Sequence, residues 1–299
     1  MGLAPLLGFL LDALLGGTRL DEQLEGWVQR SMPRIEFIVR NAFGGPTIQA
    51  GYGMAIWLAG AAIVTAWLMG VVGYVLFQEY GLFLARAVIF LLLFTARRLT
   101  ARGIEVLLLI SSGDFTGARH SLRRMGPSVH RDDTDSLSGA AVLRLSGATL
   151  GATLVPLFWG LIGGSTLAAG ALVLHIGALQ RPDDVDDAQP MWQALERING
   201  WVTTPAAWVG GLVFPLAVTL VGGRRTAALG AFLGDGRESP SDRLGRAVSR
   251  GLQLRTREDD GALIAGANEV QKVVQMLFIG GFLCAVTVST LSVFLHHLL

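Results

Sequence analysis

The ionisable residues of this chain lie mostly between its long apolar segments, and His175 is the main exception. His175 is placed inside the uncharged run Leu145–Gln180. An ionisable side chain within a membrane span is a candidate functional group. A neutral imidazole can equally hydrogen-bond a neighbouring helix, so a ligand-binding and a structural interpretation of His175 both stand.

Carboxylates and further histidines occur in two polar segments. Four aspartates are close together between residues 181 and 197: Asp183, Asp184, Asp186 and Asp187. Carboxylate oxygens suit Mg²⁺, but no phosphate-binding motif accompanies these residues, so we favour a solvated acidic loop. His120 and His130 lie in a basic stretch without a second histidine four residues away, which favours a surface role over a metal site.

Several catalytic and binding signatures are absent from the sequence. The chain has no glycine-rich phosphate loop, no zinc-protease helix and no nucleophile elbow. Its single cysteine, Cys284, excludes a disulfide within the chain and a cysteine-based metal site. The net charge of +1 gives no indication of nucleic-acid binding. The motifs alone therefore predict no metal and no cofactor.

The composition is that of a membrane protein. Apolar residues make up 52% of the 299 residues, and charged residues make up 16%. Soluble domains contain roughly 25% charged residues, and the mean hydropathy here is +0.51. We therefore predict an all-α integral membrane protein, with residues 1–299 forming a single membrane domain in contact with the lipid bilayer.

The apolar runs predict about five transmembrane helices, since a helix needs about 20 mostly apolar residues to cross a bilayer. The predicted spans are Tyr52–Phe77, Leu82–Ala96, Leu145–Gln180, Ile198–Gly223 and Val273–Leu295. The third is too long for one straight span and contains Pro156 and Gly163-Gly164, so it is a broken helix or a tight helical hairpin. Leu3–Leu15 is too short to cross, and residues 1–15 are predicted to form a re-entrant segment or a short helix against the bundle.

The loops predict the orientation. Residues 97–144 and 224–272 form arginine-rich blocks, Arg97–Arg144 and Arg224–Lys272, which should be cytoplasmic helical loops of a multi-pass inner-membrane protein. Charge places the acidic segment Arg181–Arg197 outside. Ser241–Leu254 is predicted to be an amphipathic helix that begins near Ser239-Pro240. It either lies on the cytoplasmic leaflet or forms a lid over a membrane-facing site.

Small residues indicate a packing face in the third span. The stretch "GATLGATLVPLFWGLIGG", residues 147–164, carries no charge. Gly147 and Gly151 are four residues apart, which puts them on one face of an α-helix. Small residues at this spacing allow two membrane helices to approach closely. We therefore predict that Gly147 and Gly151 contact another helix.

Several motifs, in order along the chain, resemble those of one family. "FLLDALLGG" near the start is followed by "LTARGIEVLLLISSGDFTGARHSLRRMGPSVHRDDT" and then by "VPLFWGLIGG". The three motifs resemble the opening, the cytoplasmic stretch and the Ala-Pro-Leu-Phe…Gly-Gly segment of the CobD/CbiB cobalamin-biosynthesis family. "LDEQLEGWVQR" and "PLFWGLIGG" are similar to its AmpE-like branch. The resemblance implies a divergent member of this family.

The resemblance also implies what is missing. Enzymatic members join adenosylcobyric acid to an aminoalcohol phosphate with ATP and Mg²⁺. Their acidic residues fall here on Leu143, Gly147, Gly151 and Ala178, and their lysine falls on Leu172. The polar residues that still match are Asp12, Arg131 and Asp132. Together with His175, which stands where the family has an asparagine, they form a predicted ligand-binding remnant. Because the family uses the loop equivalent to Arg181–Arg197 for site residues, the resemblance would place that loop inside.

Three functions stay open. The chain is a non-catalytic inner-membrane protein that binds a partner or an amphiphilic ligand, an adenosylcobinamide-phosphate synthase with rearranged catalytic residues, or a structural accessory subunit of a membrane complex. We favour the first, because the residues needed to hold Mg²⁺ and ATP are mostly replaced. The expected partners are the lipid bilayer and another membrane protein or further copies of this chain, with no nucleic acid.

Overall fold

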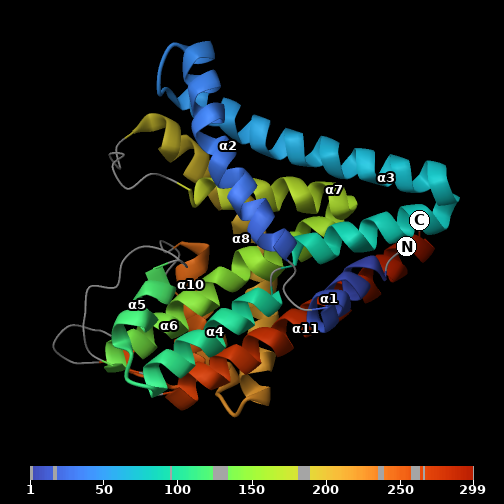
Figure 1. Cartoon of the computed structure of the whole chain (residues 1–299). Helices are drawn as coiled ribbons and strands as arrows, with labels where there is room; N and C mark the ends of the chain where they lie inside the picture. Colours follow the sequence, from blue (N-terminus) through green and yellow to red (C-terminus); the bar gives the residue numbers. More distant parts are fainter. Residues whose placement is uncertain are drawn as a thin grey trace. The chain divides into compact units, whose positions relative to one another are not determined.

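The computed structural model describes residues 3–15, 19–94, 96–123, 134–180, 189–234, 239–256, 263–264 and 267–298, and nearly all of them are helical (Figure 1). The helices are α1 (Ala4–Leu15), α2 (Arg19–Phe43), α3 (Ile48–Leu93), α4 (Ala96–Ser111), α5 (Phe115–Arg123), α6 (Thr134–Thr149), the π-helical η1 (Leu150–Leu154), α7 (Val155–Ala178), α8 (Pro190–Leu220), α9 (Arg225–Leu233), α10 (Pro240–Gly251) and α11 (Ala267–Leu298). A two-residue antiparallel ladder joins β1 (Arg255–Thr256) to β2 (Leu263–Ile264). The predicted all-α fold is confirmed.

Four helical runs among the described residues are long and apolar enough to cross a membrane. They are Ile48–Leu93, Leu137–Ala178, Pro190–Leu220 and Asn268–Phe294. The chain is therefore a multi-pass membrane protein whose apolar helices contact lipid. About five spans were predicted and four runs are found, because the predicted span Tyr52–Phe77 and most of the predicted span Leu82–Ala96 belong to the single element α3.

α3 is a helical hairpin. Its helix is interrupted at Phe77 (φ −137°, ψ 19°) and Gln78 (φ 55°, ψ −133°), which separate a long first arm from a short second arm. A Cβ atom placed on Gly73 would lie 2.6 Å from the carbonyl oxygen of Gly81 and 2.9 Å from the Cβ of Ala85. In one straight helix residues 73 and 85 would be about 18 Å apart. The chain therefore turns back on itself, as Figure 1 shows for α3.

α7 reverses in the same way. Gly163 (φ −136°, ψ 23°) and Gly164 (φ 67°, ψ −166°) interrupt the helix, and the second of these conformations favours glycine. A Cβ on Gly160 would lie 3.8 Å from the Cβ of Ala168, whereas eight residues of straight helix would separate them by about 12 Å. Thr166 Oγ1 donates a hydrogen bond to the carbonyl oxygen of Gly163 at 3.0 Å. The predicted break at Gly163-Gly164 is confirmed as a hairpin.

The chain divides into two compact units. Unit 1 contains Met1–Thr95, Val155–Ala206 and Ala285–Leu299, and unit 2 contains Ala96–Leu154 and Ala207–Cys284. Three of the four apolar runs contribute residues to both units. The division therefore does not separate a membrane part of the chain from a soluble part. The two arginine-rich blocks, residues 97–144 and 224–272, are largely helical and lie in unit 2.

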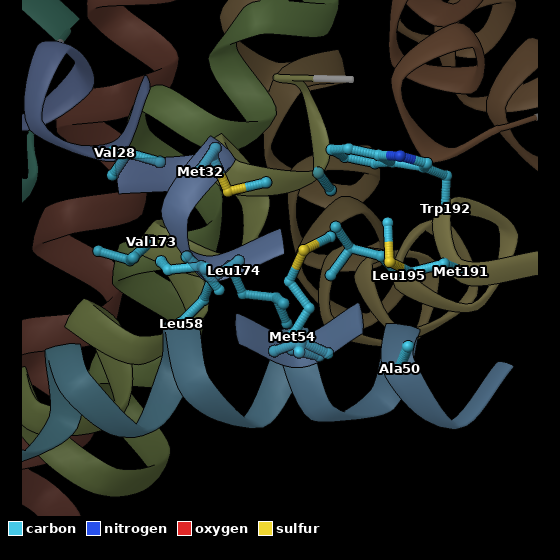
Figure 2. Close-up of a cluster of buried hydrophobic side chains, with 14 residues drawn as sticks. Val28, Met32, Ala50, Met54, Leu58, Val173, Leu174, Met191, Trp192 and Leu195 are labelled. Carbon is cyan, nitrogen blue, oxygen red and sulfur yellow. The ribbon is translucent and has the colours of Figure 1, made fainter. Parts of the chain in front are cut away.

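Unit 1 is organised around a hydrophobic cluster to which four helices contribute (Figure 2). The cluster comprises Val28, Met32, Ile35 and Val39 of α2; Ala50, Met54, Ala55 and Leu58 of α3; Val173, Leu174 and Ala178 of α7; and Met191, Trp192 and Leu195 of α8. Helix α2 was not among the sequence predictions. Its four cluster residues follow a spacing of four, three and four, which places them on one helical face.

The two hairpins pack against each other in unit 1. A Cβ on Gly170 of α7 would lie 2.7 Å from Ile63 of α3, and a Cβ on Gly177 would lie 2.6 Å from Leu58. The pairing runs in opposite directions along the two helices, so the first arm of α3 is antiparallel to the second arm of α7. α1 lies against the second arm of α3, where Gly8 contacts Phe90.

Unit 2 contains the predicted amphipathic helix, which is α10. Its predicted start is confirmed, because Ser239 Oγ accepts a hydrogen bond from the amide of Asp242 at 3.2 Å. The interpretation of α10 as a helix lying on the leaflet needs correction. Leu244 and Val248, on its apolar stripe, are buried in the protein, where α10 packs on α6 and α9. An apolar stripe that protein covers cannot enter lipid.

The fold predicts the side of the membrane on which the α7–α8 connection lies. A Cβ on Gly51, near the start of α3, would meet the carbonyl oxygen of Met191 and the Cβ of Ala194 near the start of α8. The end of α7 joins the same cluster through Ala178. The sequence prediction of two spans before a cytoplasmic block at residues 97–144 puts the start of α3 on the cytoplasmic side. Together with that prediction, the contacts within unit 1 favour the cytoplasmic alternative over the external one for the helix ends that flank the connection.

We expect impermeant maleimide to distinguish these alternatives in intact cells. In a Cys284→Ala background, Tyr80→Cys at the tip of α3 should be labelled from outside, since Tyr80 is 87% exposed and follows the break. Asp114→Cys in the arginine-rich block and Pro190→Cys at the start of α8 should be labelled only after permeabilisation. Labelling of Pro190→Cys in intact cells, with Asp114→Cys protected, would instead support the charge-based placement outside.

Candidate functional site

His175 is tied to a neighbouring helix within unit 1. Its Nδ1 lies 3.1 Å from Oδ1 of Asn199, on α8. An amide oxygen only accepts hydrogen bonds, so in this arrangement the neutral imidazole carries its proton on Nδ1. The side chain of His175 is half-buried. This hydrogen bond to a neighbouring helix agrees with the structural interpretation of His175. The other ring nitrogen, Nε2, is left for a ligand under the ligand-binding interpretation.

A second polar contact joins the same two helices. Trp159 Nε1 of α7 donates to the carbonyl oxygen of Val202 of α8 at 3.0 Å. Thr203, next along α8, directs its hydroxyl to the carbonyl oxygen of Asn199 at 2.8 Å. Interhelical hydrogen bonds in membrane proteins contribute about 0.6 kcal/mol on average. The Trp159 side chain can therefore hold α7 and α8 together, whereas the Thr203 hydroxyl bonds its own helix. Sequence reasoning missed Trp159 because an indole donor carries no spacing pattern.

Gly147 faces another helix within unit 2. A Cβ placed on Gly147 would lie 3.3 Å from the Cβ of Ser241, at the start of α10. From the opposite side, a Cβ on Gly245 of α10 would lie 3.1 Å from Cδ2 of Leu143. Glycines on both helices thus permit a close antiparallel approach of α6 and α10. Gly151 is buried in η1, where the π-helical register differs from the α-helical spacing used in the prediction.

The π-helical stretch contains a buried hydroxyl. Within the described residues, Thr153 Oγ1 has no hydrogen-bond partner, and Thr153 is 1% exposed. The preceding Thr149 Oγ1 donates to the carbonyl oxygen of Leu145 at 2.8 Å, and Ser146 Oγ donates to that of Val142 at 2.6 Å. Both follow the α-helical pattern of a bond to the fourth residue back. The wider register of η1 interrupts that pattern at Thr153.

The positions where the resemblance expects charged site residues are occupied by uncharged residues, most of which are packed. Leu172 and Ala178 of α7 are 3% and 6% exposed in unit 1. In unit 2, Leu143 and Gly147 contact α10, and Gly151 is buried. Leu143 is the exposed member of this set, at 39%. None of the five positions carries a charged group, and Gly147, Gly151, Leu172 and Ala178 serve helix packing.

The other predicted site residues are only partly described. Asp12 is buried on α1, with 4% exposure. Arg131 and Asp132 lie outside the described residues, as do His130 and the aspartates between residues 183 and 187. Among the described residues, no three His, Cys, Asp or Glu side chains are placed to share a metal ion. Within the described part of the chain, the structure brings His175 together with Asn199.

The contact of Gly147 with α10 predicts a loss of stability on substitution. Gly147→Leu should lower the free energy of unfolding by about 1–3 kcal/mol, because Ser241 leaves no room for a larger side chain. Gly60→Leu is the matched control, since no atom lies within 4 Å of a Cβ on Gly60 of α3. Thermal unfolding in detergent measures both variants. Equal melting temperatures for the two would contradict the packing role of Gly147.

The unpartnered hydroxyl of Thr153 predicts the opposite effect. Thr153→Val replaces a buried polar group by a methyl group of similar size, which should stabilise the protein by about 1 kcal/mol. Thr149→Val is the control, because its hydroxyl already donates a hydrogen bond and its removal should bring no gain. A destabilised Thr153→Val variant would show that the hydroxyl has a polar partner, such as a bound water molecule.

Comparison with other proteins does not extend these observations. No protein-family model, curated protein or solved structure matches the chain. The resemblance to the CobD/CbiB family therefore rests on the ordered sequence motifs alone. The structure itself shows a helical, multi-pass membrane protein with two hairpins. It also shows two polar contacts between α7 and α8, and a close approach of α6 to α10.

Proposed function

We propose that this chain is a non-catalytic inner-membrane protein of the CobD/CbiB–AmpE type, which acts by binding a membrane partner or a large amphiphilic ligand. The observation that carries the proposal is the use of the family's charged positions for packing. Leu172 and Ala178 are buried, and Gly147 contacts α10. A ligase that uses ATP needs carboxylates for Mg²⁺ and a cation for the phosphates at such positions.

The energetics of the membrane support the loss of those groups. A charged side chain at the centre of a bilayer costs roughly 2.5–3.5 kcal/mol on insertion scales, so it persists where a function requires it. Small residues at the same positions permit close helix contact instead. Gly147 opposite Ser241 is such a contact. The inner-membrane location is part of the proposal and rests on the two arginine-rich blocks.

The catalytic half of the proposal is tested by direct assay. The purified chain in lipid nanodiscs is incubated with adenosylcobyric acid, an aminoalcohol phosphate, ATP and Mg²⁺, beside an active synthase of the family as positive control. We expect no conversion above the protein-free background and no rescue of cobalamin synthesis in cells that lack the authentic enzyme. Turnover that is lost in Asp132→Ala would overturn the proposal and establish the synthase alternative.

The binding half needs a separate readout. After extraction in mild detergent, native mass spectrometry should reveal a stoichiometric companion, either a second membrane protein or a retained amphiphile. Adenosylcobyric acid added to the pure protein is the defined probe for the ligand-binding form, with retention on gel filtration as the signal. The binding function is refuted if the purified chain is monomeric, carries no bound partner or amphiphile and retains no corrinoid. This conclusion holds even when the catalytic assay is negative.

A further inference from the structure

The position of α2 relative to the membrane spans is set by its buried face. Val28, Met32, Ile35 and Val39 pack into the unit 1 cluster shown in Figure 2. Their partners are the first turns of α3, the last turns of α7 and the first turns of α8. Each of these segments is the end of an apolar run. α2 therefore lies at the boundary where the spans begin and end.

The opposite face of α2 combines apolar and cationic side chains. Trp27, Phe37 and Ile38 are 48%, 66% and 51% exposed. Arg30 and Arg34 are exposed as well. At 3.6 residues per turn these five residues fall within a sector of about 100°, directed away from the buried stripe. Neither water nor hydrocarbon alone suits such a face.

The structure describes the side chains of residues 26–43 of α2, and within that part no acidic side chain lies on the outer face. Glu36 is the one acidic residue between Gly26 and Phe43. It forms an ion pair with Arg40, with Oε1 and Nη2 2.6 Å apart, on the flank of the helix rather than on its outer face. Arg30 Nε donates to the carbonyl oxygen of Gly26 at 2.9 Å, which holds that side chain along the helix. The outer face thus presents two positive charges among large apolar groups.

We propose that α2 is an interfacial helix whose outer face binds anionic lipid headgroups of the leaflet at which α3 begins. The rings of Trp27 and Phe37 would enter the boundary between headgroups and acyl chains, as aromatic side chains do at membrane interfaces. The guanidinium groups of Arg30 and Arg34 reach phosphate oxygens from the same face. The arginines, rather than the rings, select anionic over zwitterionic lipids. This inference does not depend on the proposed function.

The depth of α2 is measured with the full-length chain in nanodiscs. In a Cys284→Ala background, a fluorophore is attached at Phe37→Cys, or at Ile38→Cys if the first variant misfolds. Doxyl groups near the headgroup should quench the fluorophore more strongly than doxyl groups at the end of the acyl chain, and aqueous iodide should quench it weakly.

Strong iodide quenching would place the outer face of α2 in water, and stronger quenching by the chain-end doxyl would place it in the hydrocarbon core. Protection from every quencher would indicate a protein partner, and each of these outcomes overturns the proposal.

Selectivity for anionic lipid is measured with the same label. In phosphatidylcholine nanodiscs, doxyl-labelled phosphatidylglycerol should show a local enrichment of about fivefold or more over doxyl-labelled phosphatidylcholine. Arg30→Gln with Arg34→Gln should abolish the enrichment. Arg224→Gln with Arg225→Gln is the matched control, because these arginines are exposed at the start of α9 and should leave it unchanged. Equal quenching by the two lipids in the unsubstituted chain would refute anionic binding.

Discussion

Backbone hydrogen bonding in lipid is the constraint on which this structure depends. The hydrocarbon core offers no partner for a free amide or carbonyl, so the chain must stay helical wherever lipid surrounds it. It reverses within two residues in both hairpins, and the two breaks have similar geometry. Phe77 and Gly163 have φ of −137° and −136°, and Gln78 and Gly164 have φ of 55° and 67°. In α7, the hydroxyl of Thr166 satisfies the carbonyl oxygen of Gly163 at the break.

Close approach between helices follows from the same constraint. Apolar side chains gain little by leaving lipid for protein, so membrane helices associate through tight packing and interhelical hydrogen bonds. Gly170 and Gly177 let α7 approach α3, and Gly147 lets α6 approach α10. His175 and Trp159 add the polar contacts between α7 and α8. One of these packing positions, Gly147, is a position where the resemblance to the CobD/CbiB family expects an acidic residue.

Charged residues are few inside the spans and are concentrated outside them, and one physical cause explains both observations. Leu172 and Ala178 are buried in unit 1 without any polar function. Most of the arginines lie instead on segments between the spans or on α2, where headgroups and water can solvate them. A protein built this way is suited to be held in a membrane and to bind there, which is the role that we propose for it.

The sequence by itself determined the class of the fold and several local features. The distribution of hydropathy along the chain predicted a multi-pass helical protein. The predicted spans Tyr52–Phe77 and Leu82–Ala96 lay on either side of the break at Gln78, Gly163-Gly164 marked the second reversal, and Ser239-Pro240 marked the start of α10. Only the tertiary structure decided the π-helical register that leaves Thr153 Oγ1 unpartnered, and the burial of α2 and α10. The physical reason for the rest is that lipid and protein interior are equally apolar, so an apolar face in the sequence does not reveal which of the two it will meet.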